Sequence, residues 1–339
     1  MKPDRNFVVY VAWFSGTALV LLLAAIGLSL FFKPLSGDLT RIGKWPERDF
    51  GPTLLQSSPV IQANGPLLTH QQILVLGDSF SHPNIWQSYL FESSKLETLS
   101  FEFKDVGCID NWLNWVVAQT ASDVRTIIIE VAERSFVPVF RSDRRCASST
   151  PLASAAPDKT RSTSLIPGVT LDAFYLVQTA GNALRIRWQA GSINSGEAIN
   201  VPLSNANLFS NIQANRLLYY AEDDSKKTWT QQDIAAAVEN LKNIQNRLGK
   251  LRLVIVVVPD KSTVYRSYML RAAATAEYPD IFSSIAAAGV DSVDLRNLFQ
   301  KNVANTIDLY LPNDTHLSPS GYRIMASAIA ERLQTAGEK

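Results

Sequence analysis

A serine directly after an apolar, strand-like run is the first feature of this sequence that could do chemistry. Residues 72–77, QILVLG, have the pattern of a buried strand, and the chain continues as Asp78-Ser79-Phe80. A small residue needs no special reason at such a turn. A serine nucleophile needs the same place, because its Oγ must stand free beside a general base. The interpretation therefore depends on a base elsewhere in the chain.

The chain has only three histidines, so the search for that base is short. His316 lies in LPNDTHLSPSGY, two residues after Asp314. In a turn, this spacing lets the carboxylate accept a hydrogen bond from the imidazole, which fixes the tautomer and stabilises the imidazolium. His82 is only three residues from Ser79, too close on one turn to face it in line, and His70 precedes the first strand. Ser79, His316 and Asp314 are therefore the candidate catalytic residues.

The segments around these residues predict an α/β fold. Runs of strand length, rich in β-branched residues, cover 72–77, 96–103, 126–131, 252–258 and 290–295. Helical patterns cover 85–95, 110–120, 231–248 and 279–288, and a last one runs from Pro319 to about Leu333 after Ser318 as N-cap. Such alternation implies a parallel sheet flanked by helices, which binds ligands at the carboxyl ends of its strands.

Composition excludes several classes of function. The 339 residues carry a formal net charge of +1, so no overall field favours nucleic acid. The two cysteines, Cys108 and Cys146, lack metal-ligand spacing, and we predict neither a metal nor a cofactor. In an oxidising compartment the two cysteines would be able to pair, and two free thiols fit the sequence equally well.

Residues 7–32 contain no charged side chain and predict a membrane-spanning helix. Such a helix would be about 39 Å long, enough to cross a hydrocarbon core of about 30 Å with some tilt. Tyr10 and Trp13 lie near one end, where an interfacial belt would place them. No A-x-A-like cleavage site follows, so we interpret the segment as an uncleaved anchor. Basic residues on both sides leave its orientation open.

These features predict a chain divided into an anchor, a tether and one catalytic domain. The predicted parts are a tail at 1–6, the transmembrane anchor at 7–32, a tether with little regular structure at 33–69, and a catalytic domain at 70–335 with an insertion at about 140–230. The tether is predicted from its Pro, Gly and Ser content, and the insertion from the break in strand–helix alternation.

The motifs GDSFS and DTHLSPSGY together resemble the SGNH (GDSL-like) hydrolase superfamily, and more closely its alginate O-acetyltransferase group, AlgJ and AlgX. The stretches IIEVAERSF and VVVPDKSTVYRSYML add to this resemblance. It implies an SGNH/flavodoxin-like sheet, Ser79 as nucleophile, His316 as base and Asp314 as its orienting acid. It also implies an oxyanion- or substrate-binding role for Arg134, and Gly107 is a candidate second oxyanion donor beside the Ser79 N–H.

Two departures from the family pattern bear on these roles. General SGNH enzymes place the acid three residues before histidine, where this chain has Asn313, so the Asp-x-His spacing of the alginate group fits better. In that group, however, the Asp-x-His segment precedes the serine. Here it follows the serine, as in ordinary SGNH enzymes and the D-alanylation protein DltD. Lys261 also matches the group, but a Pro-Asp-Lys turn after a strand is common, and no catalytic role is predicted for it.

The leading functional hypothesis is a membrane-anchored O-acyltransferase that O-acetylates an extracytoplasmic polysaccharide. The resemblance implies an acyl donor supplied by a multi-pass membrane O-acyltransferase, and hence a location in the bacterial inner membrane with the domain in the periplasm. A carbohydrate acetylesterase would use the same residues with water as acceptor. An inactive anchored scaffold or polysaccharide-binding subunit is a third hypothesis, for which Arg141, Arg144 and Arg145 offer a basic cluster, although a solvated loop is the commoner explanation.

Overall fold

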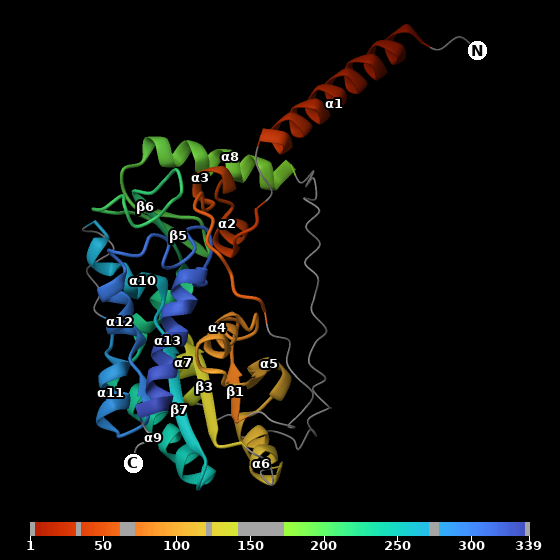
Figure 1. The fold of residues 1–339 in the computed structure, drawn as a ribbon. Coiled ribbons are helices and arrows are strands. Elements are labelled where there is room, and N and C mark those ends of the chain that lie inside the picture. The colour runs from red at the N-terminus through yellow and green to blue at the C-terminus, as the bar shows by residue number, and fades with distance from the viewer. Residues whose placement is uncertain are drawn as a thin grey trace.

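A five-stranded parallel sheet forms the centre of this computed structural model (Figure 1). The structure describes residues 4–31, 35–61, 72–119, 124–141, 173–270 and 278–335. The strands lie in the order β2-β1-β3-β7-β8, and every neighbouring pair is parallel. Their bounds are β1 Ile73–Gly77, β2 Thr98–Glu102, β3 Thr126–Ala132, β7 Arg252–Val258 and β8 Ser292–Val293. The predicted α/β class and the five predicted strands are confirmed.

Helices cover both faces of the sheet and bury the strands between them. On one face lie α4 Ile85–Ser94, α12 Leu295–Asn302 and α13 Pro319–Thr335. On the other lie α6 Ile109–Gln119, α7 Phe136–Phe140, α9 Gln231–Leu248 and α11 Ile281–Ala287. Successive strand residues point to opposite faces, so Val75 and Val254 join the first core while Leu74 and Leu253 join the second. Continuous apolar strands are the consequence of this double cover.

The last helix begins as the sequence predicts. The Gly321 N–H donates to Ser318 Oγ at 3.3 Å, an N-cap bond, and Pro319 occupies the first helical position. Tyr322, Met325 and Ile329 form its buried stripe. This cap fixes where α13 starts, only three residues after His316.

The predicted insertion contains a second, antiparallel sheet that the sequence analysis did not find. Its strands are β4 Ile193–Asn194, β5 Ala198–Pro202 and β6 Arg216–Tyr220, preceded by helix α8 Ala173–Trp188. Strands of two to five residues give too little alternation to be recognised in a sequence. Short helical turns connect the remaining elements: α5 Phe103–Val106, η1 Glu133–Ser135, η2 Ala221–Thr228, α10 Lys261–Val264 and η3 Arg266–Tyr268.

The prediction of little regular structure after the anchor is wrong for residues 38–50. Two short helices, α2 Asp38–Gly43 and α3 Glu47–Phe50, lie there. Leu39, Trp45 and Phe50 are completely buried and form a third core with residues of β4, β5 and β6. Both helices are too short to be stable alone, so this tertiary burial holds them. Further along, Gln56 Oε1 accepts a hydrogen bond from the Ser320 N–H of α13 at 2.9 Å.

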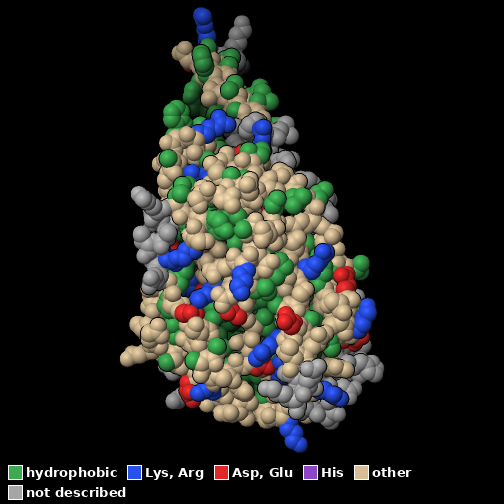
Figure 2. Space-filling model, turned by 60° about the vertical axis from the view of Figure 1, so that its left-hand side comes forward, with side chains coloured by type: hydrophobic (Ala, Val, Ile, Leu, Met, Phe, Trp, Pro, Cys, Tyr) green, Lys and Arg blue, Asp and Glu red, His purple; other side chains and the backbone are tan. Residues whose placement is uncertain are grey.

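Helix α1, Arg5–Phe31, projects from the rest of the molecule (Figure 1). Its Arg5–Gly27 part is long and apolar enough to cross a membrane, and none of that span is buried inside the protein. Hydrophobic side chains gather on this projection, at the top of Figure 2. A signal sequence near an N-terminus has the same properties, so the anchor stays a prediction.

Two leucines of the predicted tether give a matched test of its packing. Leu39 is 0% exposed and Leu55 is 97% exposed. We expect Leu39→Ala to lower the free energy of unfolding by about 2–5 kcal/mol, because it leaves a cavity in the third core. Leu55→Ala should change it by less than about 0.5 kcal/mol. Urea unfolding of the full chain measures both, and equal effects would mean that the segment does not pack as described.

Candidate active site

The structure brings Ser79, His316 and Asp314 together although Ser79 and His316 are 237 residues apart in the chain. Ser79 follows the carboxyl end of β1, and its Oγ lies 2.9 Å from His316 Nε2. On the other side of the ring, His316 Nδ1 lies 2.6 Å from Asp314 Oδ1. Each contact is within hydrogen-bond distance, in the order nucleophile, base and orienting acid. Their catalytic roles remain a prediction.

The turn that carries Ser79 is shaped by Asp78. Its Oδ1 accepts a hydrogen bond from the Phe80 N–H at 3.0 Å, and its Oδ2 accepts one from the Ala132 N–H at 2.8 Å. The second bond joins the loop after β1 to the carboxyl end of β3. Asp78 therefore fixes the turn and leaves the Ser79 side chain to face His316.

Gly77 allows this turn to lie against the buried side of the site. A Cβ at Gly77 would lie 2.5 Å from Ser81 Oγ and 2.7 Å from Glu130 Oε2, closer than side-chain atoms approach. Ser81 Oγ donates to Glu130 Oε2 at 2.7 Å, so both groups are held in place. Burial, with the nearby charge of Asp78, raises the pKa of Glu130 well above its ordinary value. The glycine of the GDSFS motif is thus needed for close approach.

Lys261 holds the turn that carries Asp314 and His316 through contacts with its main chain. The Lys261 side chain is buried, and its Nζ donates to the carbonyls of Leu311, Pro312 and Asp314 at 2.7, 3.0 and 3.1 Å. Burial lowers the pKa of Lys261 to about 7. Lys261 contacts the main chain of the site rather than its reacting atoms, so it positions the turn, a role that the sequence analysis did not assign.

Electrostatics of the pair favour a charged acid and a basic imidazole. Burial opposes the charge on Asp314, but the hydrogen bond and charge of His316 hold the pKa of Asp314 well below its usual range. Burial also opposes the charged form of His316, but Asp314, followed by Asp38 and Asp78, raises its pKa above the ordinary value. The imidazole is thereby made a better proton acceptor.

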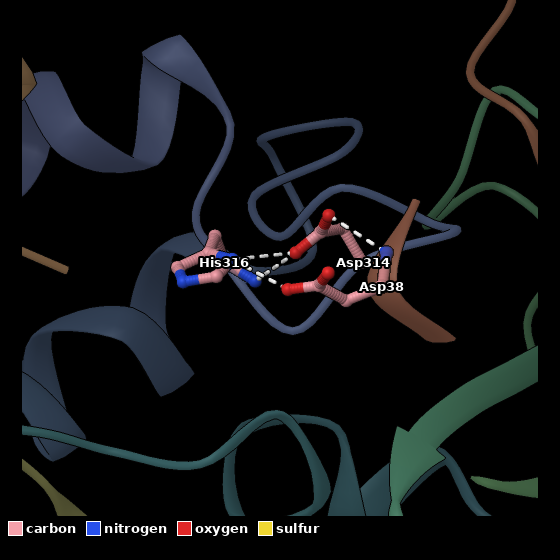
Figure 3. A group of neighbouring side chains, drawn as sticks. All are labelled: Asp38, Asp314 and His316. Atoms are coloured by element: carbon pink, nitrogen blue, oxygen red, sulfur yellow. Dashed lines mark hydrogen bonds and ion pairs between the residues drawn. The ribbon is translucent and has the colours of Figure 1, made fainter. Parts of the chain in front are cut away.

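Asp38 completes a group that the sequence analysis missed (Figure 3). Its Oδ2 lies 3.6 Å from His316 Nδ1, on the side of the ring where Asp314 also lies. Atoms of Asp38, Asp314 and His316 all lie within 4.8 Å of one another, a spacing that also suits a metal ion. Both ring nitrogens of His316 already have partners in Asp314 and Ser79, which favours proton transfer over metal ligation.

Arg134 lies in a buried ion-pair network with Asp260 and Asp223. Its Nη1 donates to Asp260 Oδ1 at 2.8 Å and lies 3.6 Å from Asp223 Oδ1. Among the described ion pairs of Arg134, neither Glu133 nor Glu130 is a partner, although both lie near it in the sequence. Burial opposes its charge, but Asp260 and Asp223 raise the pKa of Arg134. Its oxyanion role stays a prediction without a described contact to Ser79.

The same network ties the insertion to the sheet. Lys226 Nζ donates to Asp260 Oδ2 at 2.5 Å, to Glu133 Oε2 at 2.8 Å and to Thr263 Oγ1 at 2.8 Å. All of these side chains are buried, and each charge has an opposite partner, as a buried ion requires. The network joins the carboxyl ends of β3 and β7 just before Lys261.

Candidate oxyanion donors lie at the same edge of the sheet as Ser79. Among the contacts of the described residues, no protein acceptor is bound to the Ser79 N–H. Gly107 ends α5 with φ 67°, and α5 directly follows β2, the parallel neighbour of β1. No described hydrogen bond joins Gly107 to Ser79, and its role as second donor stays a prediction.

Other residues considered from the sequence lie as follows. His82 pairs with Glu102 at the end of β2. The Asn313 side chain donates to Glu47 Oε1 at 2.5 Å and not to His316, so Asp314 is the residue placed as the acid. Arg141 pairs with Asp233.

Four residues considered from the sequence lie outside the described part of the chain: His70, Arg144, Arg145 and Cys146. The pairing of Cys108 with Cys146 therefore remains a prediction.

The parallel sheet carries Ser79 after β1, and the Asp-x-His turn stands before the last helix. Residues 215–339 match the family model of the SGNH hydrolase-like domain of acetyltransferase AlgX. The matched part contains Lys261, Asp314 and His316, whereas Ser79 lies before it. The match supports an acyl-transfer or esterase type of enzyme. No curated protein matches the chain.

Replacing the buried lysine tests whether it positions the acid–base turn. Lys261→Met keeps the volume but removes the Nζ donor of three carbonyls. The Leu311 carbonyl still accepts from the Asp314 N–H, so the cost of about 1–3 kcal/mol for a group left unpaired falls on Pro312 and Asp314. We expect a lower melting temperature and at least about a tenfold loss of ester hydrolysis, because the Asp314–His316 turn shifts. Lys227→Met, at a lysine 34% exposed and paired with Asp224, is the control and should change neither. Unchanged activity in Lys261→Met would show that the turn holds itself.

Proposed function

We propose that this protein is a membrane-anchored O-acyltransferase that acetylates an extracytoplasmic polysaccharide through an acyl-enzyme on Ser79. The 2.9 Å contact of Ser79 Oγ with His316 Nε2, backed by Asp314, is the observation that carries this proposal. The match to the AlgX domain supports it. The alignment of Ser79, His316 and Asp314 also argues against an inactive scaffold, which would not need it.

The geometry suits a two-step transfer. In the first step Ser79 Oγ attacks the donor carbonyl while His316 Nε2 takes its proton, and Asp314 stabilises the imidazolium. The imidazolium then protonates the leaving group, and the acyl group stays on Ser79 as an ester. In the second step His316 removes a proton from an acceptor hydroxyl, which attacks the ester and releases Ser79 with its proton returned. The Ser79 N–H would donate to the oxyanion of both steps.

The acceptor separates transferase from esterase. A sugar hydroxyl as acceptor gives an O-acetylated polymer, and water gives hydrolysis by the same residues. The proposal of transfer rests on the AlgX match and on α1, since an anchor would keep the site beside a multi-pass membrane partner that supplies acyl groups. The corresponding location is the bacterial inner membrane, with the catalytic domain in the periplasm.

Substitutions of the three residues test the mechanism directly. With p-nitrophenyl acetate, the full chain in detergent should form an acetyl ester on Ser79, seen by mass spectrometry, and Ser79→Ala should abolish it. His316→Ala should do nearly as much, because an unassisted serine hydroxyl is a weak nucleophile. Asp314→Asn should lower the rate on the order of a hundredfold to ten-thousandfold. The full chain is required, because a product starting near His70 would lack the packed residues 38–50.

The same assay gives a pH profile with a definite sign. His316 acts as a base only when neutral, so activity should rise as pH increases through its pKa. Because Asp314 raises that pKa despite burial, the midpoint should lie above the ordinary histidine value of about 6.5. A wild-type profile that is flat from about pH 5 to 8, or full activity in His316→Ala, would exclude His316 as the base.

The topology proposal is tested separately from the chemistry. A reporter that functions only outside the cytoplasm, fused after Lys339, should be active, and membranes should retain a chain that still contains α1. A soluble product beginning after about residue 32 would show that α1 is a signal sequence. An active cytoplasmic reporter would contradict the periplasmic location.

A further inference from the structure

The segment that follows α1 reaches the Asp314–His316 pair through Asp38. The Asp38 main-chain N–H donates to Asp314 Oδ2 at 3.0 Å, on the oxygen that His316 Nδ1 does not contact. The Asp38 carboxylate meanwhile lies 3.6 Å from His316 Nδ1 (Figure 3). One residue thus contacts both members of the pair, through its main chain and through its side chain.

We propose that Asp38 is a positioning residue of the Ser79–His316–Asp314 site: its N–H fixes the Asp314 carboxylate, and its own carboxylate adds a second negative charge beside His316. This inference rests on the proposed function and extends it to the segment next to the anchor. A carboxylate held by donors on both oxygens cannot rotate away from the imidazole. A second negative charge at Nδ1 stabilises the imidazolium that forms in each step.

Several contacts hold Asp38 in this place, so the approach is not incidental. The Leu39 and Thr40 N–H groups donate to the Asn313 carbonyl at 3.0 and 3.2 Å. A Cβ at Gly37 would lie 2.2 Å from that same carbonyl oxygen, so glycine is needed there for close approach and not for its φ, which is −79°. Residues 37–40 therefore pack closely against the turn that carries Asp314.

Glu47 closes the same arrangement from inside. Its buried carboxylate accepts hydrogen bonds from Ser36 Oγ at 2.7 Å, from Thr40 Oγ1 at 2.5 Å and from Asn313 Nδ2 at 2.5 Å. It thus joins the start of α2 and the residues before that helix to Asn313, which precedes Asp314. Movement of the segment would break these bonds together.

The charged groups around His316 determine how a change at Asp38 would be seen. Asp314 and Asp38 lie at Nδ1, and Asp78 comes from the loop after β1. Arg41 pairs with Asp38 at 2.5 Å, and Lys261 lies behind the Asp314 main chain. The three carboxylates raise the pKa of His316, so removal of the Asp38 charge should lower it.

Two substitutions of Asp38 separate its charge from its N–H. Asp38→Asn removes the charge and keeps the N–H. Asp38→Pro removes both, and proline is tolerated because Asp38 is the first residue of α2 and Gly37 before it is extended. The readout is the rate of Ser79 labelling by a fluorophosphonate on the full chain over about pH 5–9, a range that brackets histidine titration.

We expect Asp38→Asn to move the acid limb of the labelling profile to lower pH and to reduce the maximal rate about tenfold. Asp38→Pro should reduce it about tenfold or more beyond that, through the lost charge-assisted hydrogen bond. Asp110→Asn, an exposed carboxylate 53% accessible and paired with Arg247, controls for charge. Gln231→Pro, at the first position of α9, controls for proline. Both controls should match wild type.

The outcomes distinguish this inference from the proposed function. If Ser79→Ala abolishes labelling and Asp38→Asn keeps the wild-type pH profile, Asp38 has no positioning role and the inference is overturned. If wild-type Ser79 is not labelled, the proposed function itself fails. Should Asp38→Pro not fold, the pH profile of Asp38→Asn decides alone, because its main chain is unchanged.

Discussion

The buried Lys261 side chain makes the contact on which the geometry of the site depends most. Three main-chain carbonyls of the 311–314 turn point to its Nζ, and buried carbonyls need such a donor. Lys261 begins α10 shortly after β7, a strand inside the sheet. Its contacts therefore connect the 311–314 turn to the central sheet. The ion pairs of Asp260 and Lys226 hold the start of α10 in turn. These contacts hold the turn that carries His316 in the position from which its imidazole contacts Ser79.

The site is built from five separate segments that only the tertiary fold brings together. The loops after β1, β3 and β7 supply Ser79, Glu133 and Lys261, as the carboxyl edge of a parallel sheet allows. The Asp314–His316 turn lies over this edge, and residues 36–47 cover the turn from outside. The small antiparallel sheet supports that cover through the third core. The antiparallel sheet thus supports residues 36–47, and these residues in turn hold the Asp314–His316 turn.

The parallel sheet and the three candidate residues were predictable because their signals are local. Continuous apolar runs mark β1, β3 and β7, and the GDSFS and Asp-x-His motifs are each a few residues long. The helices α2 and α3 were not predictable, since four to six residues carry no period and their stability comes from buried Trp45 and Phe50. Arg134 follows β3 at the carboxyl edge of the sheet, but a sequence cannot show that Asp260, 126 residues away, binds it.

The short connection between α1 and Asp38 limits where the serine can work. Six residues lie between Phe31 and Asp38, so a fully extended chain spans at most about 25 Å from one to the other. Where α1 crosses a bilayer, this leash confines the catalytic turn to a thin layer above the lipid headgroups. Diffusion of the site is then two-dimensional, and only groups that come close to the lipid surface lie within its reach.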